Sequence, residues 1–498
     1  MEQELELKLR LPAGHLRRLA RQAIVRDSLT GRPRTERLKT VYFDTPDQRL
    51  AQQGMALRVR QIGRHRIQTL KVAQPNGTGG EAMQRHAEYS APVRGHAPDL
   101  ARLGEEGLPD ALKDDGAGDL AEVFRTEVTR RVYPLSIDGS VIELAVDHGE
   151  IIAKGRQEPV SEVELELKSG DERSLFEVAR RLAERLPLTI EHRTKADRGY
   201  ALSVGRAPEP RFAGRIDLES DWTVRRGFVA VARNCLKQLY GNEIAVLAGD
   251  DAEAVHQLRV AVRRLRAAFT AFGPALTESA VSRFRSDLRW LQRELGPARD
   301  WDVFLKETLA PLRQELPSDQ GLGALAARAS AARVAAHEQA RATLRSQRYA
   351  LFQLRFEHWL GEGESEGTSL LDFARETLAR RDRRLKKAAR EIAGASHEQL
   401  HAIRIAAKKC RYTGEFFRSL FGRKATRKYL RRLRRFQDSL GSLNDAAVAK
   451  RLVAGLDIED RAVEAILSGW FAARIASDIA LSRALWEKVA ATDRPWDD

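Results

Sequence analysis

The sequence predicts an α+β protein with more than one domain, in which a strand-rich N-terminal part precedes an all-helical C-terminal part. Three observations carry this prediction. Residues 1–204 show the period-2 alternation of polar and apolar side chains that marks β-strands. Beyond residue 214 this alternation gives way to long stretches rich in Ala, Leu and Arg, which favour helices. A chain of 498 residues is also too long for one hydrophobic core.

The strands are clearest where an apolar residue occupies every second position, at residues 4–11, 56–60 and 162–168. Helices are expected to interrupt the strands around residues 12–26 and 171–186. A loop or short helical insertion is expected at residues 94–120, which are rich in Gly, Asp and Pro. The N-terminal part is therefore mainly, but not purely, β-structure.

A proline-containing segment, residues 206–217, predicts a linker between two domains. The first domain is expected to cover residues 1–205 and the helical domain residues 218–498. The two differ in charge, because residues 1–205 hold 33 Lys and Arg against 32 Asp and Glu, whereas the remainder holds 52 against 38. The net charge of +15 thus belongs almost entirely to the helical part, which predicts a polyanionic partner for that part.

The helical domain contains an internal repeat at an offset of 145 residues. The segment that begins at His256 matches without a gap the segment that begins at His401, and Asp300 corresponds to Asp445. Each Asp follows a Leu-Gly pair, so we expect the glycine to end one helix and the Asp to cap the next. A repeat of this kind predicts two homologous helical halves. The expected halves are about residues 218–360 and 370–490.

The composition excludes several classes of protein. With 43% hydrophobic and 31% charged residues, the chain is neither apolar enough for a membrane protein nor polar enough for wholesale disorder. Cys235 and Cys410 lack the neighbours of a zinc site and cannot staple a chain of this length. The acidic N-terminus does not resemble a secretory signal. We therefore expect a cytoplasmic protein without a membrane partner.

Charged residues share one face in two of the strands. Residues two apart on a strand project together, so Glu4, Glu6 and Lys8 form one such face and residues 162–168 form another. An ordinary solvated face would explain either strand alone. Several carboxylate-rich strands repel one another unless a cation offsets them, and a hard divalent ion held by oxygens suits this role. Basic residues on the same strands would then bind phosphate.

The Glu4-x-Glu6-x-Lys8 pattern resembles the ExExK signature of CYTH domains, the triphosphate tunnel metalloenzymes. Later segments agree with the family in order: 42–45, 57–60, 70–71, 143–149, 162–166 and 194–200. The resemblance covers residues 1–203 and implies an antiparallel barrel of about eight strands whose charged lumen is open to a polyphosphate.

The resemblance also implies roles for individual residues. It implies that the ligands of Mg²⁺ or Mn²⁺ are Glu4, Glu6, Asp147, Glu162, Glu164 and Glu166. It implies that the phosphates are bound by Lys8, Arg58, Arg60, Lys71, Arg85, Arg125, Arg131 and Lys195. Glu4, Glu6 and Lys8 form the expected catalytic set.

One strand departs from the family pattern. Where an Arg-x-Glu-x-Glu strand is expected, this chain has Arg85-His86-Ala87-Glu88-Tyr89-Ser90, which is shifted by one residue and ends in serine. His86, like His65, is expected to be an exposed histidine of a strand or loop rather than a catalytic group.

The inventory of charges favours attack by an activated water on a terminal phosphoryl group, without a covalent nucleophile. The family contains inorganic triphosphatases, thiamine triphosphatases and class IV adenylate cyclases, so a metal site alone does not define the substrate. The helical part favours inorganic triphosphate, because proteins similar to this chain in both halves are bacterial CYTH-CHAD proteins, among which inorganic triphosphatase is the known activity.

The repeated helices carry a basic stripe. Counting from His256, the helical step of about 100° places Arg259, Arg263 and Arg266 within about 80° of it. Residues 255–268 contain no acid, and neither do residues 399–414, whereas a solvated helix normally interleaves Glu with its cations. The duplicated acid-free stripe therefore predicts a surface for a polyanion.

This stripe resembles the CHAD domain, whose pattern is His-x-x-Arg followed by further cations and by Leu-Gly-x-x-x-Asp. The resemblance covers about residues 218–490 and implies two helical bundles around a basic groove that binds inorganic polyphosphate. The implied ligands are His256, Arg259, Arg263, Arg264, Arg266, His401, Arg404, Lys408, Lys409 and Arg411.

Two other functions stay open. The chain can be a polyphosphate-binding or targeting protein with an idle barrel, which the complete Glu4, Glu6 and Lys8 set disfavours. The basic domain can also bind nucleic acid through phosphate contacts alone. No motif for base stacking or groove reading supports that partner.

Overall fold

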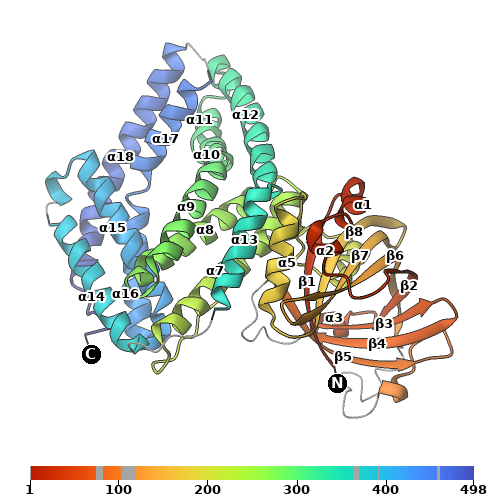
Figure 1. Cartoon of the computed structure of the whole chain (residues 1–498). Coiled ribbons are helices and arrows are strands. Elements are labelled where there is room, and N and C mark those ends of the chain that lie inside the picture. Colours follow the sequence, from red (N-terminus) through yellow and green to blue (C-terminus); the bar gives the residue numbers. More distant parts are fainter. Residues whose placement is uncertain are drawn as a thin grey trace. The chain divides into compact units, whose positions relative to one another are not determined.

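The computed structural model of the chain describes residues 2–73, 82–103, 119–362, 369–390, 392–456 and 460–497 (Figure 1). The contacts within it divide the chain into two compact units. Unit 1 consists of Met1–Pro208 and Leu344–Glu362, and unit 2 consists of Glu209–Thr343 and Gly363–Asp498.

Unit 1 is built on an antiparallel barrel of eight strands, which confirms the predicted fold class. The strands lie in the order β5-β4-β3-β2-β6-β7-β8-β1, and pairing of β1 with β5 closes the barrel. The short β9 (Thr189–Ile190) pairs with β1 in addition. The barrel strands are β1 (Glu2–Arg10), β2 (Arg34–Asp44), β3 (Met55–Ile62), β4 (His65–Ala73), β5 (Met83–Pro92), β6 (Ala121–Ile137), β7 (Ser140–Ala153) and β8 (Arg156–Ser169).

The helices of unit 1 cover the outside of the barrel and one part of its interior. They are α1 (Leu16–Leu19), α2 (Ala23–Arg26), α3 (Arg49–Gln52), α5 (Arg173–Ala183), α6 (Lys195–Val204) and α13 (Gln347–Leu360). The helix expected at residues 171–186 is α5, and the one expected at 12–26 is divided into α1 and α2. Of the insertion expected at 94–120, residues 104–118 lie outside the described residues, and Leu100–Leu103 form a 3₁₀ turn.

The helix α6 packs against β6, β7 and β8 and requires a glycine where it meets the barrel. A Cβ atom on Gly199 would lie 2.1 Å from the ring of Phe124. The same ring stacks on Tyr42 at 4.3 Å and meets Tyr200 edge-on at 5.2 Å. Gly199 therefore allows the close approach that brings α6 to the inner side chains of β6.

Among the described residues, unit 2 consists of helices and the segments that connect them, and the first four helices of its two halves follow one another in the same order. In chain order its α-helices are α7 (Val224–Ala248), α8 (Ala252–Phe272), α9 (Glu278–Glu294), α10 (Gly296–Val303), α11 (Ala310–Glu315), α12 (Gln320–Leu344), α14 (Leu370–Ala388), α15 (His397–Phe416), α16 (Arg423–Asp438), α17 (Ser442–Ala454) and α18 (Arg461–Ala490). The starts of α8 and α15, and those of α9 and α16, are each 145 residues apart. A π-helical segment, Phe304–Leu309, joins α10 to α11.

Over the described residues, no helix combines the length and apolar character needed to cross a membrane.

Candidate functional sites

Even-numbered residues of β1 point into the barrel. Leu5 and Leu7 belong to the hydrophobic cluster on the outer face, so strand alternation turns Glu4, Glu6 and Lys8 inward. The exposed fractions of Glu6 and Lys8 are only 3% and 4%. Charges buried to this degree require partners of opposite charge. Glu4, Glu6 and Lys8 therefore place both signs of charge in the interior of the barrel.

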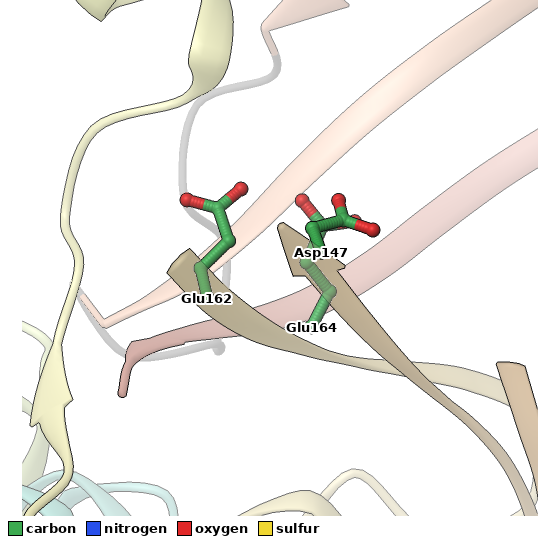
Figure 2. A group of neighbouring side chains, drawn as sticks. All are labelled: Asp147, Glu162 and Glu164. Atoms are coloured by element: carbon green, nitrogen blue, oxygen red, sulfur yellow. The ribbon is translucent and has the colours of Figure 1, made fainter. Parts of the chain in front are cut away.

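Three further carboxylates converge inside the barrel, from Asp147 on β7 and from Glu162 and Glu164 on β8 (Figure 2). Asp147 lies opposite Glu162 in the β7–β8 ladder, and Glu164 follows on the same face. One oxygen from each of the three lies within 4.8 Å of the others. We call this group the acidic triad. Figure 2 shows its carboxylates on the same side of the two strands.

Two cations neutralise the acidic triad. The Nζ of Lys195 lies 2.7 Å from Asp147 and 2.9 Å from Glu164, and it also binds Glu162. Arg130 of β6 donates two hydrogen bonds to Asp147, of 2.8 and 2.7 Å, and contacts Glu164. Burial disfavours the charged form of Asp147, but Lys195 and Arg130 outweigh it and lower the pKa of this carboxyl.

The start of α6 places Lys195 at the acidic triad. Thr194 and Asp197 form a capping box, in which each side chain accepts a hydrogen bond from the backbone N–H of the other residue. The helix therefore begins at Lys195, and Arg198 follows three residues later on the same side. Arg198 donates a 3.0 Å hydrogen bond to Glu162. The segment 194–200, which the sequence analysis quoted as a motif, is thus a capped helix start that supplies two cations.

A second group of carboxylates consists of Glu4, Glu6 and Glu88. Lys71 of β4 binds Glu4 and lies 3.4 Å from Glu88. Lys8 binds Glu6 and lies 3.2 Å from Glu164, so it connects this group to the acidic triad. Burial opposes the charge of Glu4, yet Lys71 lowers its pKa.

Glu166 is less well neutralised than the other acids. Its partner is Lys168, whose side chain is 41% exposed. Burial raises the pKa of Glu166 despite this partner, and the charge of nearby Glu4 adds to the rise. A carboxylate in this state favours an additional cation.

The residues present fit a hard divalent cation. The acidic triad offers carboxylate oxygens only, which are the ligands that Mg²⁺ and Mn²⁺ prefer. The ammonium group of Lys195 now occupies the point where the three carboxylates meet. A divalent ion held by these carboxylates would compete with Lys195 for their negative charge.

Arg58 and Arg60 line the same interior, but with little compensation by acids. Arg58 lies 3.8 Å from Glu88. Within the described ranges, Arg60 makes no ion pair with a carboxylate, and its Nε donates to Thr40 at 3.2 Å. Burial and the neighbouring charges of Arg58 and Arg130 lower the pKa of Arg60 to about 10. This crowding of cations favours an anionic ligand at Arg60.

The expected phosphate ligands Arg85, Arg125 and Arg131 do not reach the interior, so these assignments are corrected. Arg85 lies opposite Leu5 on the outer face and binds Glu172. Arg125 lies opposite Val41 and its side chain is 49% exposed. Arg131 is exposed beside the ring of Tyr133. The reason is strand parity, because a shift of one residue moves a side chain to the other face.

Sequence reasoning missed Arg130, Arg198 and the inward position of His86. A usable signal for Arg130 was present, since it is a cation between Val128 and Val132 on an otherwise apolar strand face. His86 lies opposite Glu4 in the β1–β5 ladder and is half-buried, so the expectation of an exposed histidine was wrong here. His65 is exposed as expected. Burial and the charge of Lys71 lower the pKa of His86.

In unit 2, the repeated helices α8 and α15 pack against each other and bring cations of both halves together. Burial and the charges of Arg404 and Arg263 lower the pKa of Lys408 to about 8. Within the described residues, Arg263 and Lys408 make no hydrogen bond or ion pair. We call Arg263, Arg404 and Lys408 the basic cluster, and its mutual repulsion favours a bound anion.

Arg259 belongs to the fold as much as to this surface. Its Nη1 donates to the carbonyl of Leu295 at 3.2 Å, contacts that of Gly296, and lies 3.3 Å from Asp300. Asp300 lies inside α10 and makes this ion pair, so the expected capping role is wrong for it. The equivalent Arg404 contacts Asn444 at 3.5 Å.

The remaining expected polyphosphate ligands are dispersed over several surfaces. Arg264 is buried and donates to Gln238 and Asn234 at 2.7 and 2.8 Å, which makes it a core residue. Arg266 binds Gln292, and Arg411 binds Glu415 and Gln437. Lys409 faces Arg381 and Arg384, and His401 is exposed. Burial and Arg299 lower the pKa of His256 to about 4, so it is neutral at pH 7.

The fold and sites define a barrel with a buried, charged interior, joined in the chain to a duplicated helical domain. Comparison with known families agrees, since the CYTH domain matches residues 2–200 and the CHAD domain matches residues 230–454. The crystal structure of the CHAD domain from the plant Ricinus communis is 34% identical and has a TM-score of 0.51, over 58% of this chain and 98% of that one. The chain belongs to the proteins that combine a CYTH domain with a CHAD domain.

Curated proteins similar to this chain include one from Haemophilus influenzae and one from Mycobacterium tuberculosis. The inorganic triphosphatase of Haemophilus influenzae is 34% identical over 170 residues, which are 33% of this chain and 46% of that protein. The chain thus matches less than half of that relative's length. An uncharacterized protein of Mycobacterium tuberculosis is 29% identical over 409 residues, 76% of this chain and 75% of that one.

Proposed function

We propose that unit 1 hydrolyses inorganic triphosphate to diphosphate and phosphate with the help of Mg²⁺ or Mn²⁺. One observation carries this proposal: carboxylates from β1, β7 and β8 meet buried lysines and arginines inside one closed barrel. A short phosphate chain with bound cations has the complementary pattern of charges. Similarity of the CYTH region to an inorganic triphosphatase supports this choice of substrate.

The interior side chains divide the work of the proposed reaction. Arg58, Arg60 and Lys71 bind the phosphate oxygens, because Arg60 lacks an acidic partner and Lys71 lies beside them. A water molecule attacks the terminal phosphorus while the bridging P–O bond breaks. The electron pair of the broken bond leaves with diphosphate. A carboxylate of the interior accepts the proton of that water. The carboxylates of Glu4, Glu6 and the acidic triad would hold divalent ions, which would supply Lewis-acid stabilisation of the phosphate charge.

Unit 2 binds inorganic polyphosphate through the basic cluster in this proposal. Arg263, Arg404 and Lys408 come from both halves of the repeat, so a chain of phosphates can contact both halves at once. The alternatives are a binding protein with an idle barrel and a thiamine or nucleoside triphosphatase.

Phosphate release tests the enzymatic proposal and its alternatives. Triphosphate, ATP, thiamine triphosphate and long polyphosphate are each incubated with Mg²⁺, with Mn²⁺ or with a chelator. Triphosphate turnover is expected to stop with the chelator. It is expected to fall on the order of 10²-fold or more in the Glu4→Gln/Glu6→Gln variant, which keeps the shape of both side chains.

Glu127→Gln is the matched control, because this half-buried carboxylate lies on the outer face of β6 beside Arg125. It is expected to keep wild-type turnover. Equal inactivity of wild type and both variants, with polyphosphate still bound, would establish the idle barrel. If phosphate is released faster from thiamine triphosphate or ATP than from inorganic triphosphate, the faster compound would take the place of triphosphate as the proposed substrate.

Reversal of charge tests the role of the basic cluster. Arg263→Glu/Lys408→Glu is expected to weaken polyphosphate binding by about tenfold or more, since a charge-assisted hydrogen bond contributes about 1.5–3 kcal/mol. Triphosphate hydrolysis is expected to stay unchanged. Arg461→Glu/Lys488→Glu, which reverses two exposed cations on α18, controls for net charge. Equal binding by both double variants, measured at one salt concentration, would remove the cluster from the proposal.

A further inference from the structure

His86 places an imidazole ring beside the carboxylates of Glu4 and Glu6 in the barrel interior. It lies opposite Glu4 in the β1–β5 ladder, and its side chain is 12% exposed. Its Nε2 atom is buried and has no hydrogen-bond partner. A buried polar atom without a partner is costly, so such an atom in a binding cavity indicates a group that completes it.

The neighbour of this atom indicates which kind of group is missing. Nε2 lies 3.8 Å from Oε1 of Glu6, while the other oxygen of Glu6 binds Lys8. This gap is too long for a hydrogen bond. Two ligand atoms that share a metal ion, each at about 2.1 Å from it, can lie up to about 4.2 Å apart. The 3.8 Å gap therefore suits an ion that bridges the imidazole and the carboxylate.

We infer that His86 and Glu6 bind a divalent transition-metal ion together, at a position separate from the acidic triad, with Glu4 as the adjacent carboxylate. This inference rests on the proposed function and deepens it, because it concerns which metal ion the tunnel takes. Imidazole nitrogen favours first-row transition metals, whereas Mg²⁺ favours oxygen ligands and keeps its waters. The site therefore selects Mn²⁺ over Mg²⁺.

A phosphate oxygen is the competing occupant, since a neutral imidazole can also donate a hydrogen bond. The position of Glu6 argues against it. A phosphate oxygen placed between Nε2 and the carboxylate of Glu6 would meet a negative charge at close range. Lys8, the lysine that could offset that charge, already binds Glu6.

The test uses the full-length protein with Mn²⁺ alone and measures electron spin-echo modulation, which detects nitrogen bound to the ion. The wild type is expected to show ¹⁴N modulation, which changes to the ¹⁵N pattern when histidine is labelled with ¹⁵N. His86→Gln is expected to lose it, and the exposed-histidine variant His65→Gln to keep it. Because labelling needs no substitution, the result does not depend on whether His86→Gln folds.

A second measurement compares affinities. His86→Glu replaces the nitrogen by a carboxylate, so the preference for Mn²⁺ over Mg²⁺ is expected to fall on the order of tenfold. Mn²⁺ that binds to the wild type without nitrogen modulation would overturn the inference, and so would modulation that persists in His86→Gln. In either case, triphosphate turnover by the wild type would leave the proposed function standing. Mn²⁺ that does not bind at all would overturn both.

Discussion

At the scale of single residues, the barrel interior is a balance of buried charges in which Lys195 neutralises the acidic triad. Its ammonium group contacts all three members of the acidic triad. Burial opposes its charge, but the three carboxylates raise the pKa of Lys195. Removal of one partner from a buried ion pair leaves the other uncompensated. The charge of Lys195 therefore allows the three carboxylates to stay ionised side by side.

Lys195→Met is expected to destabilise unit 1 by about 3–5 kcal/mol at pH 7. Mn²⁺ is expected to restore part of this loss, because it replaces the missing charge at the acidic triad. Thermal unfolding with and without Mn²⁺ measures both effects. Lys168→Met removes a partly exposed partner of Glu166, so it is expected to cost less than about 1 kcal/mol. Equal losses in the two variants would contradict this account.

The pH dependence of stability follows from the same contacts. In the wild type, burial favours the neutral forms of Asp147 and Glu164, but the charge of Lys195 outweighs burial. The pKa of Asp147 therefore lies below its usual 3.8, and that of Glu164 lies well below 4.5. Their contribution is present above those unfolded values and is lost as the pH falls through the folded ones. Without Lys195 both pKa values rise toward the unfolded ones, so the variant is expected to lose less stability than the wild type as the pH falls from about 5 to about 3. Denaturant unfolding across this range checks the change in slope.

Strand parity explains which interior residues could be predicted from the sequence. Alternation in β1 and β8 is regular, and it placed Glu4, Glu6 and Glu164 on the correct face. In β5 and β6 the sequence offers cations on both faces, so Arg131 was chosen where Arg130 points inward. The position that faces the lumen depends on pairing with neighbouring strands, which no single segment encodes.

At the scale of elements, α13 is the part of the fold that the sequence did not reveal. Its residues fall at the end of the first expected helical half, yet it packs against α5 and β9 of unit 1 (Figure 1). Leu354 belongs to the same hydrophobic cluster as Leu7 of β1. Gln347 donates a 2.7 Å hydrogen bond to the carbonyl of Ala183, at the end of α5. The sequence pattern of α13 does not indicate which unit it packs against, because its apolar face is like that of any amphipathic helix.

A fragment of residues 1–205 is therefore expected to fold poorly, since it leaves the cluster around Leu354 uncovered. In the full chain, Leu354→Asp is expected to destabilise unit 1 by about 3 kcal/mol or more, because it buries a charge in an apolar cluster. Leu481→Asp changes a leucine of α18 that is 52% exposed, and it is expected to change stability by less than about 0.5 kcal/mol. Co-expression of residues 344–362 with the fragment should restore soluble protein, and a stable fragment alone would refute this role.

At the scale of the whole molecule, the duplication in unit 2 was the most predictable feature. A repeat offset of 145 residues was visible in the sequence, and α8 and α15 begin at that offset. Their apolar stripes form the core, so their positions follow from local periodicity. Local periodicity did not predict which residues the cations of α8 and α15 contact. Arg264 lies in the same basic run as Arg263, but Gln238 and Asn234 bind it in the core.

The two units are expected to respond to different ligands, which hydrogen exchange of the full chain can show. A ligand that binds only a folded unit stabilises that unit by RT ln(1 + [L]/Kd), about 2.7 kcal/mol at 100 times Kd. Triphosphate with Mn²⁺ is expected to slow exchange in β1, β7, β8 and α13, because these elements belong to unit 1. Polyphosphate is expected to slow exchange in α8 and α15, where the basic cluster lies. In Arg263→Glu/Lys408→Glu the second effect should vanish and the first persist. Protection of β1 and β8 by polyphosphate in that variant would mean that the barrel, and not the helical domain, binds the long chain.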